Sequence, residues 1–247
     1  KAEQNSLAIS ALNEALKHAP SDAETRVLRG SLLRKIGDSE GALSDYEVAL
    51  KSIPDNAVLH YEIGLVLLQL GRIAKAEKHL NVAAQELNKQ PTIDLLHATT
   101  AYVLEENEES KKSLDEYLYP KIKGAELDRH HRSVSETAIY LFELLEHESD
   151  PELESKAPTS RSLRLFRDYR AGKATRKDVL DWAGRGATPK QARAQISVAA
   201  FWLAQHEKRI GNTSAHSDLL QIAIDFGIPE NPEWQFARWQ QKELPDD

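Results

Sequence analysis

The sequence contains few of the residue patterns with which proteins bind phosphates, dinucleotides or metal ions. The Gly184-Arg185-Gly186 segment lacks the third glycine of a dinucleotide-binding loop, and no alternating strand pattern precedes it. No His-Glu-x-x-His zinc motif occurs, and the chain has no Cys. The chain therefore has no thiolate metal ligand, no Cys nucleophile and no disulfide. We predict neither a cofactor nor a metal site.

The histidines and the densest carboxylates favour structural roles over catalytic ones. His130 and His131 are adjacent, and neighbouring helix residues point about 100° apart, so they do not easily share one ion. His97 stands where a packed core residue is expected. A solvated turn between helices accounts for the acidic cluster of Glu105, Glu106, Glu108 and Glu109.

No Ser, His and Asp form a recognisable catalytic triad, so we assign no catalytic residue and predict that the protein is not an enzyme. The enzymatic alternative is an unrecognised site near His130, His131 and the segment at Asp150.

Composition and charge are those of a globular chain. The 247 residues are 40% hydrophobic and 29% charged, which differs from the low apolar content of a disordered chain. The net charge of −7 argues against a general nucleic-acid binder. No apolar run approaches the roughly 18 residues that a membrane span needs.

An internal repeat with a constant period determines the expected fold. Pro20 recurs as Pro54, and Gly30 recurs as Gly64. The other matched pairs, at the same separation, are Gly37 with Gly71, Ala42 with Ala76, Tyr46 with Leu80 and Ala49 with Ala83. One period earlier, Ala8, Leu12 and Ala15 occupy the last three of these positions. The chain therefore begins inside a repeat, with Ser6–Ala19 as a second helix that has no first helix before it.

The glycines of the repeat have two different roles. Gly30 and Gly64 fall inside helices, where Gly costs about 1 kcal/mol relative to Ala, so we expect a neighbouring helix to approach closely there. We expect Ala42 and Ala76 to be the small partners on that helix. Gly37, like Gly71, suits the left-handed residue that follows a helix C-terminus.

These matched positions closely resemble the tetratricopeptide repeat family over residues 5–90. The resemblance implies an all-α fold, an α-solenoid of antiparallel helix pairs that stack on one another. It divides residues 1–124 into an array that starts mid-repeat, with repeats 23–56 and 57–90 and a degenerate unit 91–124. Residues 125–158 are expected to form a connecting helix, Ser133–Glu146, and a polar linker. Residues 159–247 are expected to form a tetratricopeptide-like helical region with a capping helix.

The resemblance also implies a site, because the first helix of each pair lines the concave groove in this family. The residues that we expect in a partner-binding groove are Val27, Arg34, Lys35, Tyr61, Leu65, Leu68, Leu95 and Tyr102. An apolar patch of this kind suits an amphipathic helix or an extended peptide. The alternative is that the C-terminal half covers the patch as part of the core. Val27 and Ser31 replace the Lys and Asn of the family's carboxylate clamp, so we do not expect chaperone-tail binding.

Charge is unevenly distributed along the chain. Residues 156–193 hold eleven basic and three acidic residues, whereas residues 105–154 hold fifteen acidic and six basic residues. These stretches can attract each other within one molecule or across a dimer. Alternatively, an anionic partner binds the basic face that is formed by Arg161, Arg164, Arg167 and Arg170, or this face is the solvated surface of an ordinary helix.

The C-terminal half resembles NlpI-type bacterial lipoproteins, which are tetratricopeptide proteins of the cell envelope. Three segments carry this resemblance: Tyr169–Leu180, Ala199–Asn212 and Glu233–Leu244. It implies a membrane-tethered periplasmic scaffold, a homodimer without catalysis of its own that brings a protease to cell-wall hydrolases. The sequence starts at Lys1, so we expect a processed or truncated chain whose missing start would have carried any signal peptide or lipid anchor.

Our functional hypothesis is thus a non-enzymatic adaptor of the bacterial envelope that binds other proteins or peptides and no nucleic acid. The alternatives are an assembly or secretion factor of the pilotin or polysaccharide-export type, and a cytoplasmic tetratricopeptide binding module.

Overall fold

The computed structural model describes residues 2–87, 90–105, 107–112, 161–186, 188–228 and 231–244. Every regular element in these ranges is an α-helix, which confirms the all-α fold class. The chain packs as two compact units, Lys1–Ile93 and Asp94–Asp247, which we call unit 1 and unit 2. The predicted helix Ser133–Glu146, the linker, His130 and His131 lie outside the described residues.

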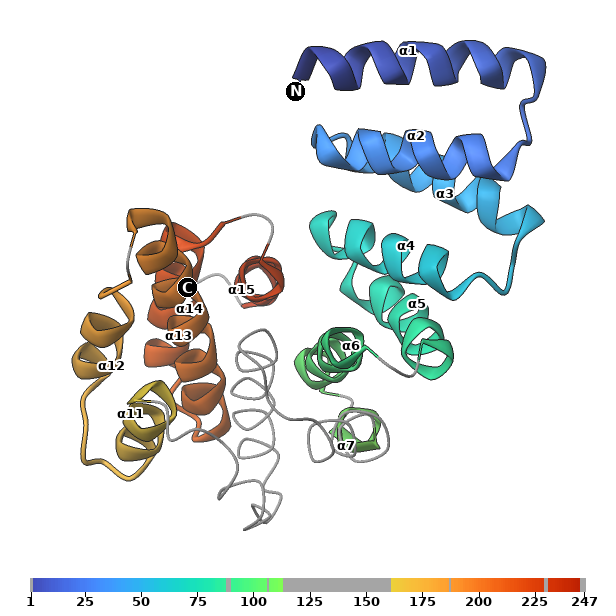
Figure 1. The fold of residues 1–247 in the computed structure, drawn as a ribbon. Helices are drawn as coiled ribbons and strands as arrows, with labels where there is room; N and C mark the ends of the chain where they lie inside the picture. The colour runs from blue at the N-terminus through green and yellow to red at the C-terminus, as the bar shows by residue number, and fades with distance from the viewer. Residues whose placement is uncertain are drawn as a thin grey trace. The chain divides into compact units, whose positions relative to one another are not determined.

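Unit 1 is a stack of helices in chain order (Figure 1). It contains α1 (Ala2–His18), α2 (Ala23–Lys35), α3 (Ser39–Ser52), α4 (Ala57–Gln69) and α5 (Ile73–Glu86). Asp22, Asp38 and Asn56 cap the N-termini of α2, α3 and α4, because each side chain accepts a backbone N–H bond of 2.9 Å from the first turn. The expected left-handed ends are present, with φ of 88° at Gly37 and 70° at Gly71.

The close approach at the mid-helix glycines has a different partner from the one predicted. A Cβ on Gly30 would lie 2.5 Å from the ring of Tyr46, and one on Gly64 would lie 2.7 Å from the Leu80 side chain. The predicted partner Ala76 comes only third at Gly64, through its carbonyl oxygen at 3.6 Å. The glycine is required because a bulky side chain of the second helix packs into the space that its own Cβ would occupy.

The repeated small and bulky residues form the core of unit 1. The three positions Ala42, Tyr46 and Ala49 are fully buried, as are their equivalents Ala76, Leu80 and Ala83. On α1, which packs against no first helix of its own pair among the described residues, the equivalent Ala8 and Leu12 are only partly buried and Ala15 is exposed. Burial of this face therefore depends on a paired helix.

Unit 2 begins with a helix pair that keeps the repeat without its glycines. It is formed by α6 (Pro91–Val103), whose first three residues belong to unit 1, and α7 (Asn107–Lys112). Ala98 stands one period after Gly64, and Ser110 stands one period after Ala76. The buried Ser110 donates a 2.8 Å bond to the Ala98 carbonyl. His97 is fully buried, as predicted for a core residue. Glu105 follows Gly37 and Gly71 in the register and keeps their left-handed backbone, with φ of 64°.

The rest of the described part of unit 2 is built around one long helix, α13. The helices of this part are α11 (Arg161–Arg170), α12 (Arg176–Ala183), α13 (Pro189–Arg209), α14 (Thr213–Phe226) and α15 (Pro232–Glu243). Every residue of α13 from 200 to 207 is buried, and Phe201 packs against Phe236 of α15 with 6.0 Å between ring centroids. Asn231 precedes α15, but its side chain makes no capping bond. The backbone N–H of Trp234 instead donates to its carbonyl at 3.2 Å.

The α13–α14 pair repeats the spacing of the N-terminal pairs. The series Ala204, Gly211, His216, Leu220 and Ala223 has the same spacing as Gly30, Gly37, Ala42, Tyr46 and Ala49. Gly211 has the left-handed φ of 78°, and the other four residues are buried. His216 Nδ1 donates a 2.9 Å bond to the Ala204 carbonyl, as Ser110 does to that of Ala98. A polar residue at the Ala42 position is thus accommodated by bonding to the helix that it packs against.

Candidate functional site

The exposed side of the first helices in unit 1 carries an apolar row. We call this surface the first-helix face; it comprises Val27 and Lys35 of α2 with Val58, Tyr61 and Leu65 of α4. Residues three and four positions apart share one side of a helix, so Val58, Tyr61 and Leu65 are in line. Val58 is 56% exposed, and the other two are half-buried. The row exposes apolar surface and is also packed against the core, because Tyr61 contacts the cluster of Ala83, Ala84 and Ile93.

Arg34 is not the free rim cation that the predicted groove assumed. Its Nε lies 3.0 Å from Glu62 Oε2, so it forms an ion pair between α2 and α4. The Tyr46 hydroxyl contacts Ser31 Oγ at 3.2 Å and Glu62 at 3.4 Å. Arg34 therefore helps to hold α2 and α4 together, while Lys35 remains exposed at the end of α2.

The other three residues predicted for the groove are Leu68, Leu95 and Tyr102. Leu68 is only 2% exposed, so it is part of the core and not of an accessible surface. Leu95 and Tyr102 belong to unit 2, where both are half-buried. Burial raises the pKa of the Tyr102 hydroxyl to about 12, so it stays protonated and neutral.

In the two complete repeats, side chains at equivalent positions connect the two helices of each pair. These side chains are charged in the first repeat and are histidines in the second. In the first, Arg26 donates to the Pro20 carbonyl at 2.7 Å and to Asp45 at 2.8 Å, and Arg29 adds bonds of 2.6 Å to both Asp45 oxygens. Arg26, Pro20 and Asp45 recur one period later as His60, Pro54 and His79.

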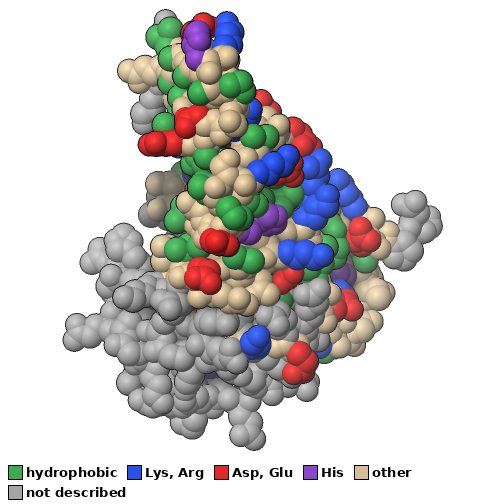
Figure 2. Space-filling model, turned by 90° about the vertical axis from the view of Figure 1, so that its right-hand side faces the viewer, with side chains coloured by type: hydrophobic (Ala, Val, Ile, Leu, Met, Phe, Trp, Pro, Cys, Tyr) green, Lys and Arg blue, Asp and Glu red, His purple; other side chains and the backbone are tan. Residues whose placement is uncertain are grey.

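The histidine pair reproduces the same connections with two imidazole rings. His60 Nε2 lies 3.0 Å from the Pro54 carbonyl, and the two Nδ1 atoms of His60 and His79 lie 3.0 Å apart. Burial, and then the neighbouring His60, lower the pKa of His79. The pair therefore favours a state in which the two imidazoles are not both protonated. On the face drawn in Figure 2, histidine, acidic, basic and apolar side chains alternate in small groups.

The four arginines predicted as a basic face do not share one environment. Arg161 and Arg164 are exposed, whereas Arg167 and Arg170 are half-buried and have interaction partners. Most of the acidic stretch that was expected to attract them lies outside the described residues. Within the described part of unit 2, Glu105 pairs with Lys208 at 2.7 Å.

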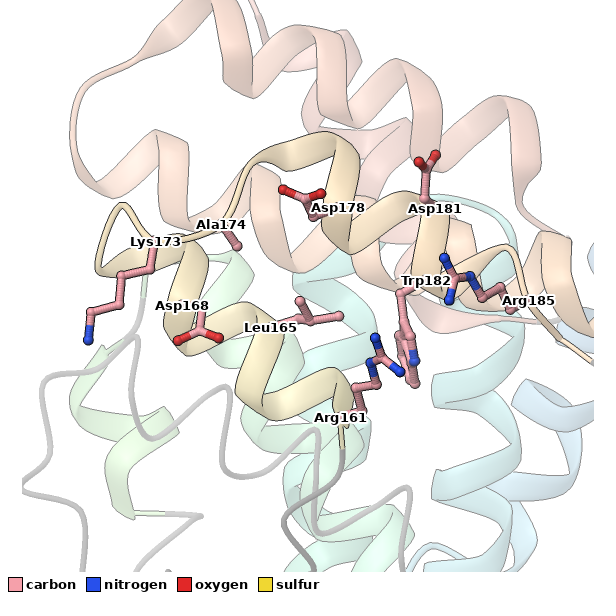
Figure 3. A pocket seen from close by; sticks show the side chains of 9 residues that line it. All are labelled: Arg161, Leu165, Asp168, Lys173, Ala174, Asp178, Asp181, Trp182 and Arg185. Carbon is pink, nitrogen blue, oxygen red and sulfur yellow. The ribbon is translucent and has the colours of Figure 1, made fainter.

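A pocket of about 380 Å³ lies between α11 and α12. It forms because the left-handed Gly172, with φ of 69°, reverses the chain and brings the start of α11 to the end of α12. Arg161, Lys173 and Arg185 supply its positive charges, Asp168, Asp178 and Asp181 supply the negative ones, and Leu165, Ala174 and Trp182 supply apolar surface. Figure 3 shows Arg161 and Arg185 both reaching toward the Trp182 ring.

A second polar group is buried beside α13. Glu207 is 4% exposed and accepts hydrogen bonds from the Tyr169 hydroxyl and, at 2.6 Å, from Asn212 Nδ2. Burial and the bond to Glu207 raise the pKa of Tyr169, so its proton stays on the phenol. His206 lies edge-on to Tyr169 at 5.8 Å, and burial lowers the pKa of its imidazole. This arrangement ties α11 to α13 and has no described cavity of its own.

Comparison with known proteins finds a family match over the N-terminal array. Residues 1–57 and 28–91 match the tetratricopeptide repeat family. The match spans the helices of unit 1, and repeats of this family generally mediate protein–protein interaction. The α13–α14 pair has the same internal spacing but lies outside the matched residues. No curated protein matches the chain at a significant level.

The described residues hold neither a candidate metal site nor a candidate membrane-spanning helix. No group of three or more His, Asp or Glu residues in those ranges is arranged to hold a metal ion. No helix there is long and apolar enough to cross a membrane.

The pocket residues other than Arg161 were not predicted from the sequence. A signal was present, because residues on opposite sides of the Gly172 turn face each other across an antiparallel helix hairpin. Arg161 precedes Gly172 by roughly the distance at which Trp182 and Arg185 follow it.

Proposed function

We propose that this protein is a non-enzymatic adaptor that holds segments of other proteins on the first-helix face of unit 1. The observation that carries the proposal is the apolar row of Val58, Tyr61 and Leu65, which lies on a tetratricopeptide repeat. Such a row suits the apolar side of an amphipathic helix, or alternate side chains of an extended peptide. Lys35 adds one exposed positive charge for an acidic group of the partner.

We further propose that the adaptor acts in the bacterial cell envelope and couples a protease to cell-wall hydrolases, as a tethered homodimer. The support for this finer proposal is the resemblance of three C-terminal segments to NlpI-type lipoproteins. These segments fall on α11 and α12, on α13, and on α15, and Phe201 of α13 packs against Phe236 of α15.

The envelope role is tested by affinity capture from an envelope extract, read by mass spectrometry, with light scattering on the purified chain. Enrichment of proteases and peptidoglycan hydrolases, with a mass near twice 27.7 kDa, supports the dimeric envelope adaptor. Enrichment of cytoplasmic proteins alone, or a monomer that captures none, contradicts it.

The binding face is tested with Leu65→Glu and Val58→Glu, which place a charge in the apolar row. We expect both variants to lose captured partners at least tenfold while the far-UV circular dichroism spectrum keeps its helical shape. Leu7→Glu is the matched control, because Leu7 is 68% exposed on α1, outside this face. Unfolding of both face variants would show that the row is core; equal loss in the control would show a non-specific effect of charge.

A further inference from the structure

The pocket between α11 and α12 has two ends that differ in charge (Figure 3). At one end Arg161 and Arg185 approach the Trp182 ring. At the other end lie Asp168, Lys173 and Ala174, and Leu165 lies between the two ends. The first end thus holds two arginines, an aromatic ring and Asp181, and the other holds one basic and one acidic side chain.

Two of the three pocket carboxylates are already engaged in their own helix. Asp178 accepts bonds of 2.8 Å and 2.6 Å from the backbone and hydroxyl of Thr175, in a capping box that also lowers the pKa of this carboxyl. Asp181 forms an ion pair with Lys177 one turn earlier. These carboxylates therefore do not neutralise the arginines beside Trp182.

Arg161 and Arg185 themselves form no ion pair with any described residue, and both are exposed. Two guanidinium groups that line one pocket repel each other, and an anion between them relieves this repulsion. A guanidinium group binds a carboxylate through two parallel hydrogen bonds, and it stacks favourably on an aromatic face. The half-buried Trp182 provides that face and a surface for an apolar group next to the anion.

We propose that this pocket is a second partner site, which binds an acidic protein segment in which a carboxylate side chain stands next to an apolar one. The carboxylate pairs with Arg161 and Arg185, and the apolar side chain lies on Trp182 and Leu165. The pocket volume of about 380 Å³ accommodates one or two side chains and not a folded surface. The three carboxylates at the pocket disfavour a polyanionic glycan or a flat anionic membrane, which would bring negative charge to all of them. The proposal does not depend on the first-helix face, which lies in the other unit.

The test uses a fluorescein-labelled peptide that carries a single Glu-Leu pair among neutral residues and measures its anisotropy with the full chain. We expect saturable binding that weakens as salt rises, and at least fivefold weaker binding to Arg161→Gln and to Arg185→Gln. Arg164→Gln is the matched control, because Arg164 is exposed on the same helix but does not line the pocket. It should bind within twofold of the unaltered chain.

A charge reversal keeps the test decisive. The double variant Arg161→Glu and Arg185→Glu should lose the Glu peptide and gain a peptide in which Lys replaces Glu. The proposal is overturned if the Gln version of the peptide binds equally well or if Arg164→Gln weakens binding as much as the pocket variants. It is also overturned if phosphatidylglycerol vesicles or heparin bind in an Arg161-dependent way while the peptide does not.

Discussion

At the residue scale, the position of Ala42 in the second helix of a pair is occupied by Ala, Ser or His in different pairs. Ala42 and Ala76 are buried there without a polar group, whereas Ser110 and His216 satisfy theirs by donating to the carbonyl of the facing helix. A buried donor that lacks such a partner would cost roughly 1–3 kcal/mol. His216 therefore fits only because its Nδ1 carries the proton that the Ala204 carbonyl accepts.

Burial of His216 predicts a loss of stability in acid. Burial is the largest effect on this imidazole and lowers its pKa, although the bond to Ala204 opposes the shift. Below a pH of about 6.5 the unfolded chain takes up a proton that the folded state resists, so the free energy of unfolding falls as the pH drops. His216→Ser keeps a donor, as at Ser110, and removes the titration. We expect urea melts at pH 7.5 and pH 5 to differ less for this variant than for the unaltered chain.

The control for the pH experiment is His18→Ser, since His18 is exposed on α1. This variant shows what the replacement of an exposed histidine does to the same difference between pH 7.5 and pH 5. His79 and His206, whose pKa values burial also lowers, leave part of the dependence in place. An unchanged difference between the two pH values in His216→Ser would contradict the assignment.

At the element scale, the end of each first helix requires a left-handed residue, whichever side chain stands there. Gly37 and Gly71 adopt this backbone without a Cβ, whereas Glu105 adopts it with one. Left-handed backbone costs a non-glycine residue roughly 1–2 kcal/mol. The ion pair of Glu105 with Lys208 offsets only part of this, because both side chains are solvent-exposed and such pairs contribute about 0–1 kcal/mol.

Glu105→Gly is therefore expected to raise the free energy of unfolding by up to about 1 kcal/mol. Chemical denaturation at neutral pH measures the change. Lys208→Gln removes the ion pair alone and should lower stability by less than about 1 kcal/mol, which separates the backbone effect from the charge effect. A clear loss of stability in Glu105→Gly would mean that the side chain matters more than the backbone.

At the scale of the whole molecule, two units of different composition share one chain. All four tryptophans, at positions 182, 202, 234 and 239, lie in unit 2, so tryptophan fluorescence reports on that unit alone. Helical circular dichroism reports on both units. In unit 1 the buried Asp45 holds Arg26 and Arg29, and its side chain is only 2% exposed.

We expect Asp45→Asn to destabilise unit 1 by roughly 2–4 kcal/mol, because it leaves two partly buried arginines without their carboxylate. The circular dichroism transition should then move to lower denaturant concentration, while the tryptophan fluorescence transition stays where it is. Movement of both transitions together would show that the two units unfold as one.

Much of the fold followed from local sequence patterns. The constant repeat period identified the helix pairs, and Gly37 and Gly71 identified where the first helices end, since a left-handed glycine acts on its own backbone. Surface exposure was harder to predict. Helical periodicity places Leu65 and Leu68 near each other, yet one is half-buried and the other is core.

The sequence alone determined that this protein is a stack of helix pairs, because the repeat period and the glycines at helix ends are local properties of the sequence. It also determined the polar, cysteine-free composition. Only the tertiary structure decided which charges are free. Arg34 is paired with Glu62, whereas Arg161 and Arg185 meet at Trp182 without a carboxylate partner among the described residues. The reason is physical: the state of a charge depends on neighbours that are distant in sequence, and packing alone brings those neighbours together.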